Sequence, residues 1–243
     1  MEIDKMSTDL FNQHSSKRFN EELEALRNSV MRMGGLVEKH LYTAIESIIA
    51  GDSKMALQVA QEDYKINAME VEIDENCNRI LATRSPAAAD LRLIVAVIKT
   101  ITDLERIGDE AQRISYLASR LASDSQPQDH YRELKALGEH VLSMLHDSLD
   151  SFSRLDAKDA LAVVEEDKLV DEQYDMITRQ CLSLMIEDPG TIKRFMDVTW
   201  VARALERIGD HAQNIAEYVI YLAHGRDIRH IKLEEVRQKL NDS

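Results

Sequence analysis

The chain has 243 residues, 44% of them hydrophobic and 30% charged, a balance typical of a soluble globular protein. Its formal net charge of −14 opposes binding to a phosphate backbone, so we expect no nucleic-acid partner. Only 8 Gly, 3 Pro and 5% aromatic residues are present, and this composition predicts helices rather than strands.

Targeting signals are absent from the sequence pattern. The first ten residues, MEIDKMSTDL, do not resemble a signal peptide, and no apolar run approaches the roughly 20 residues of a spanning helix. The two cysteines, Cys77 and Cys181, suit a reducing compartment better than a disulfide framework. We therefore expect a cytoplasmic protein in which both cysteines are small core residues.

Three long helices are expected in the first half of the chain, at residues 20–50, 53–83 and 86–122. Apolar residues of the first run recur at three- and four-residue spacing from Leu23 to Ile45. Gly51 ends this run, and Asp52 is a suitable N-cap for the second helix. Ser85 before Pro86 indicates the N-cap and first turn of the third helix.

The second half repeats the pattern of the first. Residues 156–167 match residues 52–63 at seven of twelve positions, and Cys181 follows Cys77 by the same 104 residues. Helices are therefore expected at 130–155, 157–187 and 190–224, with start signals at Asp156 and Asp188. A short amphipathic helix is expected within residues 230–240, and residues 1–15 are expected to be loosely held.

The expected fold is all-α, a tandem duplication of an elongated antiparallel three-helix bundle with six long helices. Short connections make consecutive helices antiparallel, and a helix of thirty residues is about 45 Å long. We place the first unit, with a short N-terminal arm, at residues 1–125. The second unit, with a C-terminal tail, is placed at residues 126–243.

One stretch is repeated almost unchanged: LERIGDEAQRI at 104–114 returns as LERIGDHAQNI at 205–215, identical at nine of eleven positions. Each copy places a Glu and an Asp four residues apart, on one face of a helix. The preceding helix of each unit adds oxygen-bearing side chains at matching positions. If the helices face each other, these groups converge into sites suited to Mg²⁺, Mn²⁺ or iron.

Other interpretations of this motif stay open. Acidic stripes on helices are most often solvated surface, and Arg106 and Arg207 would then bind acids of a neighbouring helix as a packing clasp. Gly108 and Gly209 indicate a close approach of two helices, and His211 is expected at the surface. The chain has no Glu-x-x-His, His-Glu-x-x-His or Walker A sequence, so no catalytic residue is predicted.

In combination these motifs resemble the PhoU family of phosphate-signalling regulators. The matching pieces are the two LERIGD motifs, MGGLVEKHL at 33–41, MEVEIDENC at 69–77, SPAAADLRLIVAVIKT at 85–100 and EDKLVDEQYD at 166–175. The resemblance implies a negative regulator of phosphate-starvation signalling that controls phosphate uptake. Such a regulator would be a non-enzymatic adaptor between the high-affinity phosphate ABC transporter ATPase and a sensor histidine kinase. The resemblance also implies a homodimer and peripheral membrane association through these partners.

The resemblance further implies metal binding through Glu/Asp-x-x-x-Asp motifs on the bundle faces. The first site would consist of Asp63, Asn67, Glu105 and Asp109, and the second of Asp167, Asp171, Glu206 and Asp210. Asn67 departs from the acidic pattern, so the first site is expected to hold metal more weakly or to hold fewer ions. The alternative functions are a metal-dependent carboxylate-cluster enzyme, a metal-storage bundle, or a purely structural helical scaffold.

Overall fold

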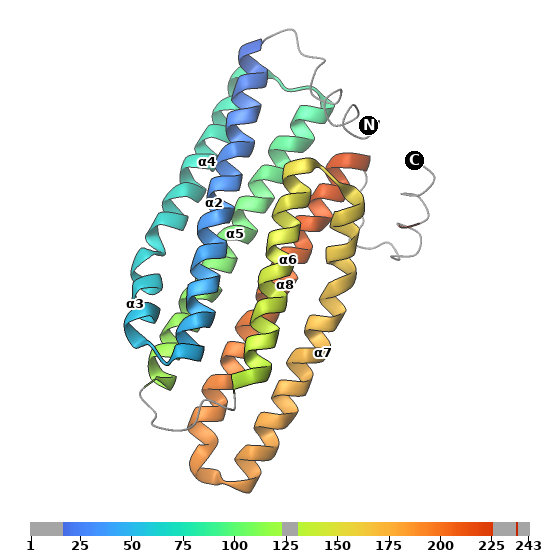
Figure 1. Ribbon diagram of the computed structural model, residues 1–243. Helices are drawn as coiled ribbons and strands as arrows, with labels where there is room; N and C mark the ends of the chain where they lie inside the picture. Colours follow the sequence, from blue (N-terminus) through green and yellow to red (C-terminus); the bar gives the residue numbers. More distant parts are fainter. Residues whose placement is uncertain (1–16, 123–130, 226–236, 238–243) are drawn as a thin grey trace.

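The computed structural model of the chain describes residues 17–122, 131–225 and 237, and every regular element within these ranges is helical (Figure 1). This confirms the all-α expectation with six long helices, α3 and α4 being two pieces of one of them. The arm at residues 1–15 and, except for Arg237, the helix expected at 230–240 lie outside the described residues. The elements are α2 (Lys17–Ala50), α3 (Ser53–Glu62), α4 (Tyr64–Arg84), α5 (Ala88–Leu121), α6 (Arg132–Arg154), α7 (Ala157–Glu187), the 3-10 turn η2 (Pro189–Thr191) and α8 (Ile192–His224).

Two helices, α3 and α7, begin at the capping signals of the sequence. The Asp52 carboxylate accepts hydrogen bonds from the first backbone N–H groups of α3 at 2.9 and 3.1 Å, and Asp156 caps α7 in the same way. Ser85, however, is not the N-cap of α5, and this prediction was wrong. It ends α4 in the left-handed conformation with φ 47°, and α5 begins three residues later at Ala88.

The helix expected at 53–83 is interrupted at Asp63. Gln112 on α5 donates a hydrogen bond of 3.2 Å to the carbonyl oxygen of Ala60, which an unbroken helix would use internally. The chain resumes as α4, whose first turn is tightened by a 2.9 Å bond from the Ile66 N–H to the Asp63 carbonyl. A side chain inserted into the backbone ladder is a recognised cause of a helix break.

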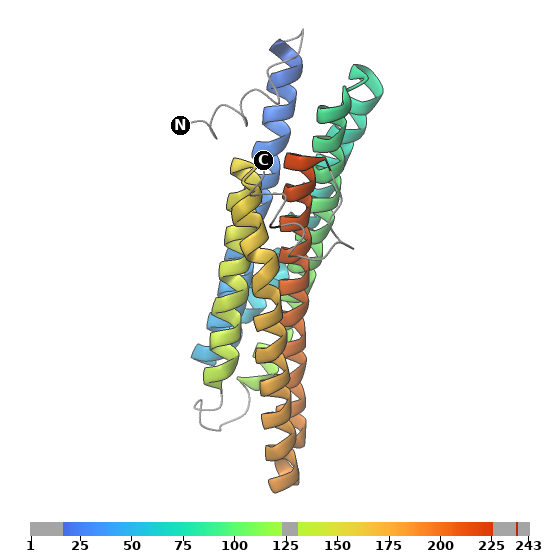
Figure 2. The same cartoon turned by 90° about the vertical axis from the view of Figure 1, so that its right-hand side faces the viewer.

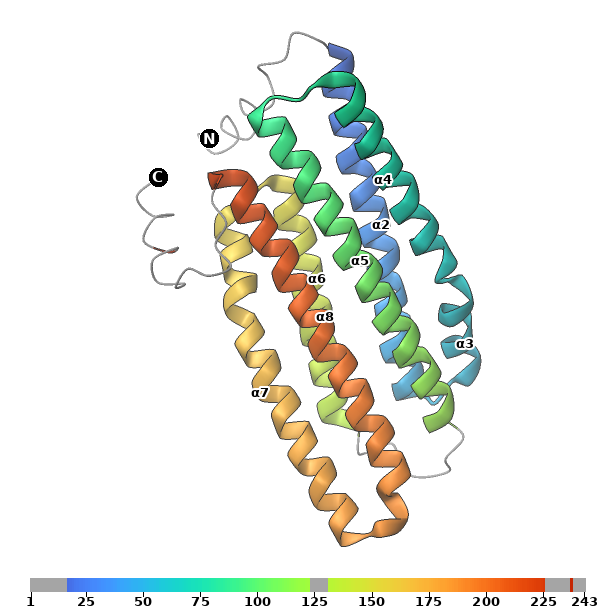
Figure 3. The ribbon, with the colours of Figure 1, turned by 180° about the vertical axis from the view of Figure 1, so that it is seen from behind.

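The helices form two bundles that lie side by side. Helices α2, α3–α4 and α5 pack together, as do α6, α7 and α8, and the bundles meet where α5 packs on α8 and α2 on α6 (Figures 1 and 3). Figure 2 shows the long axes of the helices running in nearly the same direction. The end of the α7–α8 hairpin around η2 projects beyond the other helices in all three views.

The contact between α2 and α6 shows the internal symmetry of the chain. A Cβ added to Gly34 would lie 2.8 Å from Leu149 Cδ1, and one added to Gly138 would lie 3.0 Å from Ile45 Cδ1. Both members of the first pair have their counterpart 104 residues away in the second, so the two bundles pack through equivalent surfaces. Buried residues of both bundles, including the free cysteines Cys77 and Cys181, form one continuous core, as expected for these cysteines.

Two further expectations concern boundaries and membranes. The division at residues 125 and 126 falls in the segment 123–130, outside the described residues, and stays a prediction. Within the described ranges, no helix is both long and apolar enough to cross a membrane.

Candidate functional site

The first acidic cluster lies where the start of α4 meets the LERIGD stretch of α5. Gly108 allows this approach, because a Cβ there would lie 3.0 Å from Ile66 Cδ1 and 3.5 Å from Asp63 Oδ1. Asp63 is therefore held against α5, close to the carboxylates of Glu105 and Asp109. The predicted packing role of Gly108 is confirmed, and the packing is what brings the acids of the two helices together.

Electrostatics show that the four predicted side chains share one site. Burial and then the charge of Asp109 raise the pKa of Asp63, and the same two causes raise the pKa of Glu105. Glu70 also belongs to the cluster, since burial, Asp74 and Asp109 raise its pKa and its charge acts on Glu105. Asn67 is present as predicted, and its Nδ2 donates a 3.4 Å hydrogen bond to Asp63 Oδ2.

The second cluster has the same construction between α7 and α8. A Cβ added to Gly209 would lie 3.2 Å from Val170 Cγ1 and 3.5 Å from Asp167 Oδ1. Burial, Asp210 and Asp171 raise the pKa of Asp167 to about 6. Burial and Asp210 likewise raise the pKa of Glu206, to which Asp171 and Asp167 also contribute.

An arginine without a basic counterpart in the first unit distinguishes the second cluster, although Arg106 lies beside Glu105 in the first. Arg203 donates a hydrogen bond to Glu206 Oε1 and stacks over the Tyr174 ring with its guanidinium carbon 5.7 Å from the ring centre. The equivalent positions of the first unit hold Thr102 and Glu70. The first cluster thus has the Glu70 carboxylate, whereas the second has the Arg203 guanidinium. The negative charge of Glu70 offsets the charge that the first cluster lacks at Asn67.

Each cluster contains one buried carboxylate oxygen without a hydrogen-bond partner among the described residues. These atoms are Oδ1 of Asp63, whose residue is 5% exposed, and Oε2 of Glu206, whose residue is 8% exposed. An unpaired buried carboxylate oxygen is unfavourable unless a cation, a proton or water compensates it. Oxygen-only donor sets of this kind fit hard divalent cations.

The side chains are not gathered as ligands around one point. Over residues 17–122 and 131–225, no three His, Cys, Asp or Glu side chains are close enough together to form a metal-ligand group as they stand. The oxygen donors of these residues therefore fit a cation chemically, although they do not form such a group within the described ranges.

Sequence reasoning predicted one polar contact between the two bundles and missed others. Arg207 Nη1 lies 2.5 Å from Glu110 Oε1 on α5, so this arginine is the clasp that one interpretation predicted. His211 was expected at the surface, and this was wrong, because its Nδ1 lies 2.7 Å from Asp103 Oδ1. Asn214 Nδ2 donates to the same oxygen at 3.3 Å. No local pattern connects residues that are about 100 positions apart in the chain.

Arg106, the counterpart of Arg207, makes no such clasp among the described residues. Its Nε lies 3.6 Å from the neighbouring Glu105 carboxylate on an exposed face. The two arginines of the repeated motif therefore have different roles.

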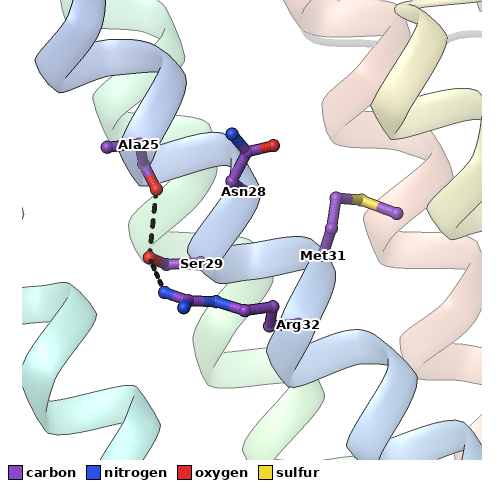
Figure 4. A pocket seen from close by; sticks show the side chains of 5 residues that line it. All are labelled: Ala25, Asn28, Ser29, Met31 and Arg32. Atoms are coloured by element: carbon purple, nitrogen blue, oxygen red, sulfur yellow. Dashed lines mark hydrogen bonds between the residues drawn. The ribbon is translucent and has the colours of Figure 1, made fainter.

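A groove lies on α2, and none of its lining residues belongs to either cluster (Figure 4). It is wide and open to solvent, with a volume of about 630 Å³. Its polar side chains bond locally, with Arg32 donating to Ser29 Oγ at 2.9 Å and Ser29 to the Ala25 carbonyl at 3.0 Å. All of its lining residues come from one helix, and we assign it no ligand.

Comparison with known proteins gives one consistent family. A family model described as the PhoU domain matches residues 30–118 and again 134–219. A Pseudomonas aeruginosa protein named phosphate-specific transport system accessory protein PhoU homolog is 45% identical over 238 residues, 98% of each chain. The Escherichia coli K12 protein named phosphate-specific transport system accessory protein PhoU is 45% identical over 229 residues, 94% of this chain and 95% of its own.

Two crystal structures have the same fold. That of PhoU from Pseudomonas aeruginosa superposes with a TM-score of 0.83 at 48% identity, covering 86% of this chain and 100% of that one. That of the phosphate transport system regulatory protein PhoU from Streptococcus pneumoniae has a TM-score of 0.81 at 28% identity, covering 86% and 98%.

Proposed function

This chain belongs to the PhoU family, and on that premise we propose that it is an accessory protein that regulates phosphate transport. The observation that carries the proposal is the match of the family model to both units. Relatives named phosphate-specific transport system accessory proteins also align with almost the full chain. The long exposed helix faces support a binding protein. No arrangement of side chains within the described ranges favours the alternative of a carboxylate-cluster enzyme or a storage bundle.

In its finer form, the proposed function is negative regulation of the phosphate-starvation response. The protein acts in the cytoplasm, without catalysis, as an adaptor between the phosphate ABC transporter ATPase and a sensor histidine kinase. It forms a homodimer and reaches the membrane through these partners.

Deletion of the gene tests this proposal. Alkaline phosphatase should then be made at high phosphate, and a plasmid copy of the gene should restore its repression. Normal repression in the deletion strain would refute the regulatory function. Equilibrium sedimentation tests the homodimer, since a single species of about 28 kDa, the mass of one chain, would exclude it.

We further propose that the two acidic clusters bind Mg²⁺, Mn²⁺ or iron ions that do not take part in catalysis. Support comes from the unpaired oxygens of Asp63 and Glu206 and from the raised carboxyl pKa values, which a nearby cation would lower again. Because Arg203 already neutralises Glu206, the first cluster should bind a divalent ion at least as tightly as the second. This order reverses the one expected from Asn67 alone.

Calorimetric titration with MgCl₂ and MnCl₂ tests the cation proposal. The variant Glu105→Gln with Asp109→Asn should lose the heat of the tighter binding event. The variant Glu206→Gln with Asp210→Asn should lose the heat of the weaker one. Heats unchanged in both variants would remove these residues from consideration. Arg203→Ala should strengthen binding at the second cluster, and no change on this substitution would show that the arginine does not set the order.

A further inference from the structure

An apolar surface covers the projecting end of the α7–α8 hairpin. Its members are large hydrophobic side chains between 41% and 73% exposed: Leu182, Ile186, Ile192, Met196 and Trp200. Helix α7 provides the first two at a spacing of four residues, and α8 provides the other three at the same spacing. Apolar side chains gathered in this way on a soluble protein commonly mark a binding surface.

This apolar surface lies on the same side of the hairpin as the second acidic cluster. Ile192 precedes Asp210 by 18 residues, which is five full turns of an α-helix, so both side chains leave α8 in the same direction. Leu182 follows Asp171 by eleven residues, about three turns, and shares its side of α7. The outer face of the hairpin is therefore apolar at its tip and acidic about 27 Å further along.

The first unit does not carry the same surface. The positions equivalent to Leu182 and Ile186, 104 residues earlier, are Asn78 and Ala82, both exposed on α4. Since the two units share one backbone pattern, the helix architecture does not require apolar side chains at the tip. On α5, Leu91 is 44% exposed at the position equivalent to Ile192, so only the α7 half of this surface belongs to the second unit alone.

The charges of this face discriminate among three possible binding partners: an anionic lipid surface, a second copy of the chain and a helix of another protein. An anionic lipid surface would meet the carboxylates of Asp167, Asp171 and Asp210, which repel it. A second copy would bring a chain of net charge −14 against the same acidic half. A helix with an apolar stripe near one end and Lys or Arg near the other complements both halves, and about 20 residues would span them.

We propose that the outer face of the α7–α8 hairpin is the docking site for one such helix of a partner protein. The partner helix places its apolar end on Ile186 and Met196 and its basic end over the second acidic cluster. There the exposed carboxylates of Asp171 and Asp210 are acceptors for a Lys or Arg of the partner. The inference rests on the proposed regulatory function only in requiring that a protein partner exists.

Photo-crosslinking in living cells tests this docking site. The probe is benzoylphenylalanine placed at Ile186, with Val71 as a control that is similarly exposed on the first unit. Mass spectrometry of the adduct formed at position 186 should identify a partner segment with the apolar and basic pattern described, and the adduct should be missing at position 71. Absence of an adduct at 186, or an adduct with lipid or a second copy, would overturn the proposal.

Two variants give an independent measure. A synthetic peptide of the crosslinked segment should bind Ile186→Ser with Met196→Ser at least tenfold more weakly than the wild type, and Val71→Ser equally well. Circular dichroism should be unchanged, because all of the replaced side chains are exposed. Equal affinity of the double variant would refute the assignment of the apolar half.

The same variants separate this inference from the proposed function. In the deletion strain, a plasmid copy with both substitutions should fail to repress alkaline phosphatase, and the Val71→Ser copy should repress it. Full repression by the double variant would end the docking proposal and leave the regulatory function standing. Normal repression in the deletion strain itself would end the regulatory function.

Discussion

Replacing Asp167 by Asn should stabilise the cation-free protein at neutral pH. Asp167 faces three other acids of the second cluster, and its pKa is raised to about 6 by burial, Asp210 and Asp171. Between an ordinary carboxyl value of 3.8 and this raised value, the folded protein binds more protons than the unfolded chain. Stability contributed by this residue therefore falls as the pH rises from about 4 to about 6, and the penalty persists above pH 6.

The size of the effect follows from the raised pKa. A change from 3.8 to about 6 corresponds to about 3 kcal/mol if it is fully realised. Asp167 is only partly buried, and solvent screening reduces this to about 1–2 kcal/mol. Asn has almost the same shape without the charge, so the substitution should recover most of that energy. For a chain of this length, the midpoint of thermal unfolding should rise by roughly 2–8 °C.

Thermal unfolding in EDTA at pH 7.5 and pH 4 is the assay. Asp167→Asn should raise the midpoint at pH 7.5 and leave it nearly unchanged at pH 4, where the wild-type carboxyl is already protonated. Glu172→Gln, on the exposed side of the same helix, should change neither. Added Mg²⁺ should stabilise the wild type more than the Asn variant. An equal gain at both pH values, or no gain at pH 7.5, would refute the electrostatic reasoning.

Two further pairs of variants test the packing and the clasp. Gly108→Ala should lower the free energy of unfolding by about 1 kcal/mol because the new methyl group crowds α4. Gly35→Ala should raise it by about 0.5–1 kcal/mol, because a Cβ there has nothing within 4 Å and alanine favours the helix. Urea denaturation measures both free energies. Arg207→Ala should destabilise by about 2 kcal/mol because it leaves Glu110, 4% exposed, with Arg113 as its one remaining ion-pair partner among the described residues. Arg106→Ala should change stability by less than about 0.5 kcal/mol in the same assay. Equal effects within either pair would contradict its explanation.

Local signals explain what could be predicted from the sequence. Asp52 and Asp156 cap their helices through contacts two and three residues away, so the local sequence is enough to predict where each helix begins. Gly108 and Gly209 stand within a helical pattern that disfavours glycine, which indicated a close approach before any partner helix was known. The acidic clusters were predictable because the duplicated order of helices places equivalent residues at equivalent contacts.

Long-range contacts explain what could not be predicted. The break at Asp63 depends on a side-chain amide of Gln112, and nothing in the residues around 63 signals it. Arg203 looks like an ordinary surface residue of α8 in the sequence, yet it pairs with Glu206 and changes the charge of the second cluster. The contact of His211 with Asp103 joins residues 108 positions apart.

The two positions at which the repeated motif differs carry contacts between the bundles through Glu110, His211 and Asn214. Glu110 of the first copy meets Arg207 and Arg113, and His211 of the second copy, at the equivalent position, meets Asp103. At the other differing position, Arg113 of the first copy pairs with Glu110, and Asn214 of the second copy donates a hydrogen bond to Asp103. Most unchanged positions of the motif serve tasks within one unit: the acids of the cluster, the close glycine and the buried isoleucine. Arg207 is the exception, because it contacts Glu110 of the other unit.

Divergence at these positions makes the contact between the units specific. Two identical copies of the first motif would place a Glu and an Arg opposite Asp103, which is 7% exposed, in place of His211 and Asn214. A Glu beside this buried acid would repel it, whereas His211 contacts it at 2.7 Å, so the diverged residue favours the present pairing of the units. The conserved part of the repeat thus preserves two acidic faces, and the diverged part holds them in one fixed relation within the chain.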